Sequence, residues 1–188
     1  MELTRSLVES KAEEYAAEEP LYAVEAEQVR GLPAAFATGD FGWRDAEWVV
    51  RWHYRRYLGA IPNDRRRAAE GAFGENEYEA VQDALVAAAG AADPLDALDD
   101  LTALSGVDVP VASAFLLFLD PEANLVVGER EWTVLHAAGE LEGSQPDPIG
   151  PADYGEFLDA GRAVGDRLDV SMWTLYRALW RLWKDEFG

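Results

Sequence analysis

The sequence contains no cysteine, which excludes disulfide bonds, thiolate nucleophiles, cysteine-ligated zinc and iron–sulfur clusters. Histidine is almost as scarce: His53 and His136 are the only two, and they lie far apart in the chain. A single histidine among aromatic or apolar neighbours is usually structural, so a histidine-rich metal site is not expected. A magnesium ion held by carboxylates alone stays open. We predict no cofactor.

Long apolar runs are also missing. The longest, Val109–Leu119, is far shorter than the roughly 20 residues that cross a bilayer. Residues 1–20 are too acidic and too broken in apolarity for a signal peptide. We therefore expect a soluble, cytoplasmic protein that does not contact a membrane.

Lysine is the third scarce residue, since Lys11 and Lys184 are the only two. Asp and Glu number 36 against 16 Lys and Arg, and the formal net charge is −20 at pH 7. An acidic surface with almost no lysine resembles the surfaces of proteins from salt-loving archaea, where carboxylates keep the protein hydrated. We interpret the charge first as halophilic adaptation and only second as a signal for a partner.

The alternating pattern of a β-strand is absent too, whereas apolar residues follow helical spacing over nearly the whole chain. Prolines at helix starts and glycines in the breaks support the same boundaries. The predicted fold class is therefore all-α, with roughly nine to ten helices. They cover residues 4–18, 22–30, 44–58, 64–71, 76–89, 94–104, 109–118, 129–138, 152–167 and 171–186.

The 188 residues, 49% of them hydrophobic, suit one domain with a substantial core. The segment 143–151, "GSQPDPIGP", is the clearest loop by composition. No internal repeat is visible. We therefore expect residues 1–188 to form a single all-α domain, with a possible division into two lobes at 143–151.

A glycine-centred turn separates the helix predicted before it from the one at 109–118. Its glycine permits a positive φ angle, and bare N–H groups ahead of a helix suit a phosphate. Residues 95–118 thus have the form of a helix-hairpin-helix element. An ordinary helical corner that serves only packing explains the same pattern. The turn consists of Ser105, Gly106, Val107 and Asp108.

The stretch from Leu101 to Leu135 resembles the helix-hairpin-helix DNA glycosylase superfamily. That superfamily has a Leu-x-Gly-Val-Gly hairpin, a helix of small residues, a proline-bearing loop and a Val-Asp-Thr-like segment. The resemblance is loose over residues 44–186, where "RALW" at 177–180 is similar to a divergent branch. It implies a DNA-glycosylase-like arrangement of helices and contact with duplex or damaged DNA. The matching residues are Leu104, Gly106, Val107, Ala112, Pro121 and the segment "VVGEREW" at 126–132.

The sequence departs from the family's pattern at the functional positions. Gly128 stands where the family has its catalytic aspartate, and Pro110 stands where bifunctional members have an imine-forming lysine. Asp108 replaces the second hairpin glycine, and its charge opposes a phosphate. These three differences argue against ordinary glycosylase chemistry.

Glu129 directly follows the position of the missing aspartate and is the one catalytic candidate. The helix dipole also favours an acid in a first helical turn, which explains Glu129 without catalysis. Arg130 and Trp132 are binding candidates beside it. Pairing of Arg130 with Glu131 and burial of Trp132 in the core are the structural alternatives.

Positive charge is concentrated in residues 44–67, which hold seven arginines and three acids. Arg44, Arg51 and Arg55 fall on one helical stripe beside Trp48 and Trp52. Arginine suits phosphates and stacked bases better than lysine, so this stripe is a candidate DNA contact. Pairing with the protein's own carboxylates is an equally weighted alternative.

The C-terminal segment predicts a helix with one aromatic seam. Arg177 lies beside the seam and is the last binding candidate. Burial against the core explains most of the pattern, and a homodimer or another protein partner is the functional alternative. The seam consists of Trp173, Tyr176, Trp180, Trp183 and Phe187.

Three functions compete at this point. The first is an uncharacterised helix-hairpin-helix glycosylase-like protein that binds DNA through its hairpin without hydrolysis. The second in rank is a protein-interaction or structural module that kept the fold. The third is a divergent DNA N-glycosylase that flips a base and uses Glu129.

Overall fold

Ten α-helices and no strands make up the computed structural model, which describes residues 1–188. The predicted fold class is confirmed. None of the helices is long and apolar enough to cross a bilayer. The helices are α1 (Arg5–Glu18), α2 (Tyr22–Thr38), α3 (Trp43–Arg55), α4 (Asn63–Phe73), α5 (Tyr78–Gly90), α6 (Pro94–Thr102), α7 (Val109–Leu119), α8 (Glu129–Ala137), α9 (Pro151–Leu168) and α10 (Met172–Glu186).

The largest difference from the predicted boundaries is in α2, which continues to Thr38 instead of ending at residue 30. The helix passes through Pro33, which lacks the N–H donor of a backbone hydrogen bond. Leu32 and Phe36 are both buried and lie one turn apart. Burial of these two side chains outweighs the hydrogen bond lost at the proline.

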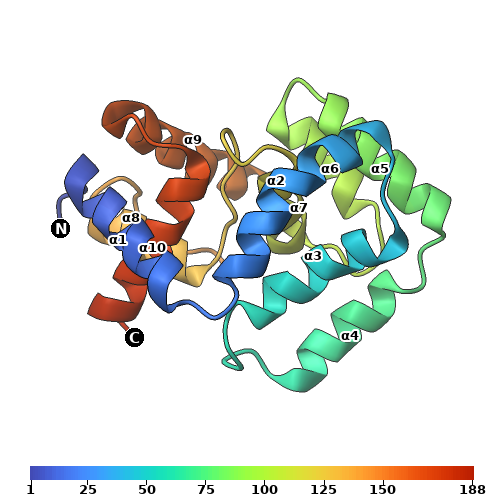
Figure 1. The fold of residues 1–188 in the computed structure, drawn as a ribbon, viewed down its shortest axis with the longest axis horizontal. Coiled ribbons are helices and arrows are strands. Elements are labelled where there is room, and N and C mark those ends of the chain that lie inside the picture. The colour runs from blue at the N-terminus through green and yellow to red at the C-terminus, as the bar shows by residue number, and fades with distance from the viewer.

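Helix α7 lies at the centre of the fold, with α2, α3 and α6 packed around it (Figure 1). Every residue from Val111 to Phe118 is buried. The hydroxyl of Ser113 donates to the carbonyl oxygen of Pro110 at 2.7 Å and accepts from the N–H of Val127 at 3.0 Å. This hydroxyl therefore ties the start of α7 to the segment that leads into α8.

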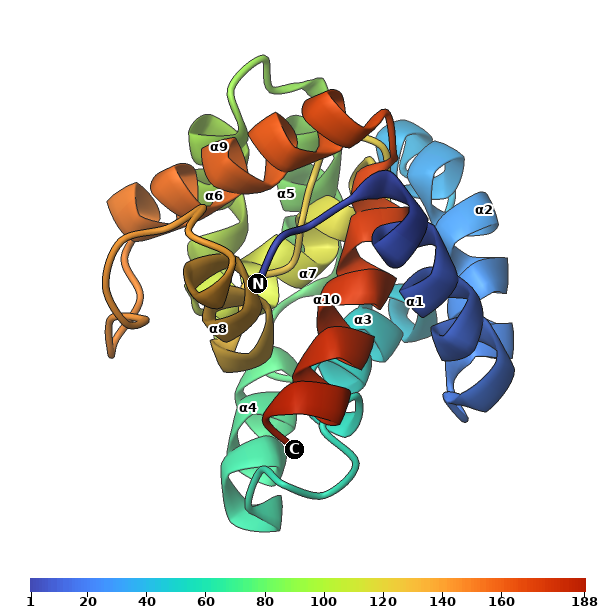
Figure 2. The same ribbon diagram turned by 90° about the vertical axis from the view of Figure 1, so that its left-hand side faces the viewer.

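The helices form two groups around one core. Helices α2–α7 form the first group, and in the second α10 contacts α1, α8 and α9 (Figure 2). The buried apolar residues from Leu3 to Leu182 form a single continuous cluster. The loop 143–151 joins α8 to α9 and so lies within the second group.

The aromatic seam of α10 faces this core. Trp173, Tyr176 and Trp180 are buried, whereas Phe187 at the end of the helix is 47% exposed. Most of the seam is therefore covered within the chain itself.

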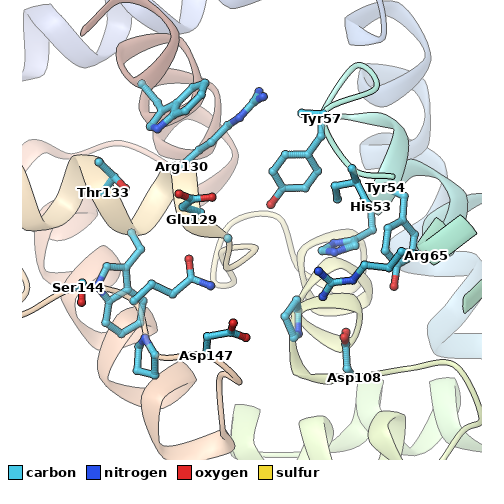
Figure 3. A pocket seen from close by; sticks show the side chains of 18 of the residues that line it. His53, Tyr54, Tyr57, Arg65, Asp108, Glu129, Arg130, Thr133, Ser144 and Asp147 are labelled. Carbon is cyan, nitrogen blue, oxygen red and sulfur yellow. The ribbon is translucent and has the colours of Figure 1, made fainter. Parts of the chain in front are cut away.

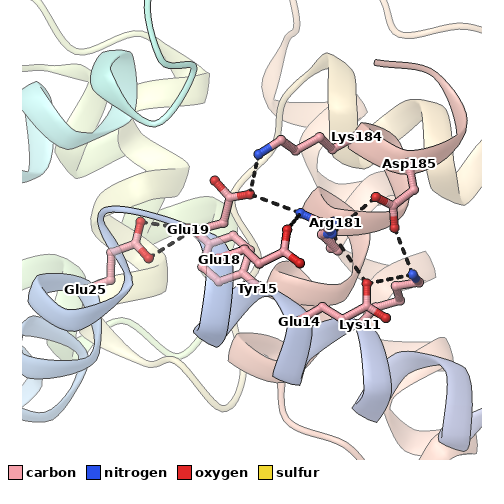
Figure 4. Close-up of polar contacts among 9 residues, drawn as sticks. All are labelled: Lys11, Glu14, Tyr15, Glu18, Glu19, Glu25, Arg181, Lys184 and Asp185. Carbon is pink, nitrogen blue, oxygen red and sulfur yellow. Dashed lines mark hydrogen bonds and ion pairs between the residues drawn. The ribbon is translucent and has the colours of Figure 1, made fainter.

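Ion pairs join α1 to α10 along one edge of that contact (Figure 4). Arg181 Nη1 lies 2.7 Å from Glu18, and its Nε lies 3.2 Å from Asp185. Lys11 Nζ bridges Glu14 and Asp185 at 2.7 and 2.8 Å. Both of the chain's lysines take part in this network, since Lys184 pairs with Glu19.

Candidate functional site

A cavity of about 630 Å³ opens where the N-terminal ends of α7 and α8 meet the loop that follows α3. Its volume is typical of small-molecule sites in proteins. Side chains reach it from α8 and the loop 144–147 on one side, and from α3, α4 and the start of α7 on the other (Figure 3). Six residues singled out in the sequence line it: Asp108, Pro110, Gly128, Glu129, Arg130 and Trp132.

The hairpin between α6 and α7 lies beside this cavity and packs on α4. Gly106 has a φ angle of +77°. A Cβ atom at Gly106 would lie 2.6 Å from the backbone nitrogen of Phe73 and 2.7 Å from the carbonyl oxygen of Ala69. The close approach of the two backbones thus requires glycine here, with or without a ligand.

Part of the hairpin backbone is already hydrogen-bonded. The side chain of Asn76 accepts from the N–H of Ser105 at 2.9 Å and donates to the Ser105 carbonyl at 3.0 Å. The N–H groups of Gly106, Asp108 and Val109 have no partner within the chain. These three donors are the part of the hairpin left for an external acceptor.

The orientation of Asp108 follows from its place at the N-cap of α7. Its carboxylate accepts from the N–H of Val111 at 3.0 Å, and the residue is exposed at the cavity rim. The carboxylate therefore has a structural role as a helix cap.

Gly128 has no room for a side chain. A Cβ atom there would lie 2.7 Å from both Arg56 Nη2 and Glu131 Oε2, and closer still to the hydroxyl of Tyr57. The φ angle of Gly128 is −165°, which any residue adopts, so the restriction comes from its neighbours alone. The place where the resemblance expects a catalytic aspartate is filled by these three side chains.

Arg56 and Glu131 form a buried ion pair behind that position, with 2.6 Å between Nη1 and Oε1. Both side chains are at most 1% exposed. Burial is the largest single effect and lowers the pKa of Arg56, but the charge and hydrogen bond of Glu131 together with Tyr57 and Tyr176 outweigh it and hold that pKa well above its usual value. The guanidinium group also lies 4.5 Å from the ring centre of Tyr57 and 5.5 Å from that of Trp180. The pair is thus enclosed by aromatic rings.

His53 lines the same cavity and is 5% exposed. Its Nδ1 atom is buried without a hydrogen-bond partner, and no hydrogen bond is formed by Nε2 either. Burial, with smaller contributions from the charges of Arg56 and Arg65, lowers the pKa of His53 well below its usual value. The ring is therefore neutral at pH 7 and free to bond to a ligand.

The buried neutral ring makes stability depend on pH. The unfolded chain takes up a proton near the ordinary histidine pKa of about 6.5, whereas the folded chain does so only at lower pH. Unfolding is therefore favoured as pH falls below about 6.5, by about 1 kcal/mol between pH 7.5 and 5.5. Urea unfolding of the wild type and of His53→Phe at the two pH values should show this decrease only in the wild type.

A suitable control for that comparison is His136→Gln, because His136 is exposed. This variant should keep the wild-type decrease. An equal decrease in His53→Phe would show that other groups cause the pH dependence.

Arginines without partners gather at the cavities. Arg65 and Arg130, which face the first cavity, make no hydrogen bond or ion pair through the guanidinium group. The expected pairing of Arg130 with Glu131 does not form, because Glu131 is bonded to Arg56. Only three further arginines are without a partner. They are Arg44, Arg55 and Arg67.

Arg130 is instead held by aromatic rings. Its guanidinium carbon lies 4.0 Å from the ring centre of Trp180 and 4.2 Å from that of Trp183. Burial lowers the pKa of Arg130, which means that the charged form lacks part of its solvation. A ligand anion at the cavity would supply the missing partner.

Glu129 is exposed at the opening of the cavity, at the N-terminal end of α8. Its carboxylate has no ion pair or hydrogen-bond partner, and Asp147 faces the same space (Figure 3). No group of three or more carboxylates and imidazoles in the chain is arranged to hold a metal ion.

The arginine stripe does not reach this cavity. Each helical residue is rotated about 100° from the one before, so Arg51 and Arg55 lie on the opposite face of α3 from His53. Together with Arg44 they line a second cavity that is also lined by the start of α2. The structure therefore separates the stripe from the hairpin.

Arg177 and Trp132 have partners within the chain. The guanidinium group of Arg177 donates to the carbonyl oxygen of Ala12 at 3.3 Å and lies outside both cavities. Trp132 is buried, stacks on Phe157 and donates to the carbonyl oxygen of Gly143. Packing explains both residues.

Sequence reasoning missed three residues that shape the first cavity, namely Arg56, Tyr57 and Glu131. For His53 the sequence left open a structural role and a role in sensing pH or contacting a phosphate. The pairing of Arg56 with Glu131 joins residues 75 positions apart, which helical spacing does not predict. Helical spacing places Tyr57 one turn after His53, and this is the only signal that the sequence offered.

We compared the chain with protein-family models, curated proteins and solved structures. No match was found in any of the three comparisons. The residues of the two cavities and of the hairpin therefore carry the functional argument.

Proposed function

We propose that the protein binds duplex or damaged DNA through its hairpin and takes one nucleotide, turned out of the duplex, into the cavity between α7 and α8, without cleaving its glycosidic bond. One observation carries the proposal. The guanidinium groups of Arg65 and Arg130 have no hydrogen-bond or ion-pair partner although the chain has a net charge of −20, and both face a cavity beside the hairpin. The resemblance to the helix-hairpin-helix glycosylases supports the same ligand.

The polar groups of the cavity suit a nucleotide. Arg65 and Arg130 provide cations for its phosphates, and the free N–H groups at the hairpin suit the neighbouring backbone. The neutral ring of His53 and the Gln145 Oε1 atom, which is buried without a partner, offer hydrogen bonds to an uncharged base. A flipped base needs such contacts in place of its lost pairing.

The absence of hydrolysis follows from the surroundings of Gly128. In the family pattern, a carboxylate at this position stabilises the charge that develops on the sugar. Here the space is taken by Tyr57 and by the ion pair of Arg56 with Glu131. Neither provides a free carboxylate at the floor of the cavity, so binding without cleavage is the expected outcome.

The test must be made in concentrated salt. The net charge of −20 repels DNA in dilute buffer, whereas near 1 M salt the Debye length is only about 3 Å. We would measure fluorescence polarisation of duplexes that contain an intact, an abasic or a damaged site. 2-Aminopurine at the target position would report base extrusion by a rise in its emission.

Arg65→Gln should weaken binding by about tenfold, because one phosphate loses its charged hydrogen bond. Arg67→Gln is the matched control, since Arg67 is on the same helix, is exposed and unpaired, and lines neither cavity. Equal losses in both variants would mean that Arg65 acts through general electrostatic attraction to DNA and not through a contact inside the cavity. A folded wild type that binds no duplex would refute the proposal and favour the protein-interaction module.

One observation favours a second candidate function, a divergent DNA N-glycosylase. The free carboxylate of Glu129 faces the same cavity and is available to a sugar or a water molecule. Release of a base by the wild type, lost in Glu129→Gln, would establish that activity. Release that persists in Glu129→Gln would remove Glu129 from the mechanism.

A further inference from the structure

A second cavity of about 550 Å³ lies on the opposite face of α3 from the first. The start of α2 forms its other wall. Four of its eight lining residues are apolar and three are arginines. They are Leu21, Val24, Arg44, Glu47, Trp48, Arg51, Trp52 and Arg55.

Positive charge dominates this cavity. Arg44 and Arg55 are exposed and have no ion pair. Arg51 Nη2 donates to Glu47 at 2.7 Å, which holds the side chain in place, while its Nε atom is buried without a partner. In an acidic chain, three arginines with a single carboxylate between them form a local site for an anion.

A fixed aromatic surface lies between these arginines. Trp48 is half-buried and stacks on Trp52, with ring centres 6.3 Å apart and planes 22° apart. Trp52 is itself held by the bond from its Nε1 to Glu25 at 2.7 Å. Val24 across the cavity is 44% exposed. The apolar part of the site is thus preformed and accessible.

We infer that this second cavity binds a nucleotide, with the base against Trp48 and the phosphates on the arginines. The spacing of residues along α3 fits this placement of the base and the phosphates. Trp48 lies one turn from Arg44 and one turn from Arg51, and Arg55 follows at about 6 Å beyond Arg51 along the axis. A phosphate alone leaves the aromatic surface unused, and a neutral aromatic molecule leaves the arginines unpaired.

This site is independent of the proposed DNA contact. Its residues are on the face of α3 directed away from the first cavity, and the two sets of lining residues share no member. The two proposals can therefore fail separately.

Calorimetry with adenosine monophosphate, adenosine and inorganic phosphate tests the inference. The monophosphate should bind wild type more tightly than either fragment, and Arg44→Gln/Arg55→Gln should weaken it by about tenfold or more. Trp48→Phe should weaken binding of the monophosphate by a smaller factor. It should also remove part of the quenching of tryptophan fluorescence that the bound base causes in the wild type. Arg67→Gln, whose arginine lines neither cavity, should bind it as wild type does, and melting curves would establish that each variant is folded.

Three results would overturn the inference: no binding of the monophosphate, equal binding of monophosphate and phosphate, or a loss caused by Arg65→Gln but not by the double variant. The last result would move the nucleotide to the first cavity. Competition with a short 5′-phosphorylated single strand distinguishes two sources of the ligand. Displacement supports a nucleic-acid end at this site, and its absence supports a free nucleotide.

Discussion

Replacing Glu131 with glutamine is expected to lower the free energy of unfolding by about 3–5 kcal/mol. The change leaves Arg56, which is 1% exposed, without its counter-ion in a site that water does not reach. Arg56 cannot avoid the cost by losing its proton, because a guanidinium group stays charged in proteins. The aromatic rings around it supply only part of the lost stabilisation.

Urea unfolding at pH 7 measures this loss, and a double variant provides the control. Arg56→Met/Glu131→Leu removes both charges and keeps apolar volume, so it should recover most of the stability. A Glu131→Gln variant as stable as wild type would mean that water or another anion reaches Arg56. That result would also weaken the explanation given for Gly128.

Gly128→Asp is expected to destabilise the fold by about 3 kcal/mol or more and to produce no base release. Its Cβ atom overlaps the space of Arg56, Glu131 and the Tyr57 hydroxyl, so these groups must move apart. The added carboxylate also competes with Glu131 for Arg56. The substitution that introduces the aspartate expected from the glycosylase resemblance therefore damages the site that would use it.

Two further variants separate the steric effect from the charge. Gly128→Ala adds only the Cβ atom and should cost less than Gly128→Asp in thermal or urea unfolding. In a Tyr57→Phe background, which lacks the hydroxyl nearest to that atom, Gly128→Ala should cost less again. If Gly128→Asp folds normally and releases a base, the steric argument is wrong, and the missing carboxylate alone accounts for a wild type that does not hydrolyse.

The sequence was sufficient to predict the helices, although the helix predicted at 44–58 ends at Arg55 and the loop after it lines the first cavity. Apolar periodicity with proline and glycine boundaries located ten helices, including the starts of α7 and α8 next to the cavity. The largest exception was α2, because the burial that carries the helix through Pro33 is a tertiary effect. Local signals identify helices well when they agree with the packing, and α2 is the case where they do not.

Local sequence patterns did not predict which side chains distant in the chain contact one another. Helical spacing put Arg44, Arg51 and Arg55 on one face, but it left open what that face contacts. It also left open which arginines form ion pairs with acids. Arg51 and Arg66 bind acids one turn away, whereas Arg56 binds Glu131 across the fold. Only the three-dimensional arrangement distinguishes a paired arginine from one available to a ligand.

The contact of α1 with α10 has a consequence for the order of folding. The residues joined by Lys11 and Asp185 are separated by 174 positions, so the loop that closes when they meet includes most of the protein. Closing such a loop is entropically costly and slow compared with forming local helical contacts. We therefore expect α2–α7 to assemble first and α1 to dock late, with Tyr15 exposed to water until α10 is in place.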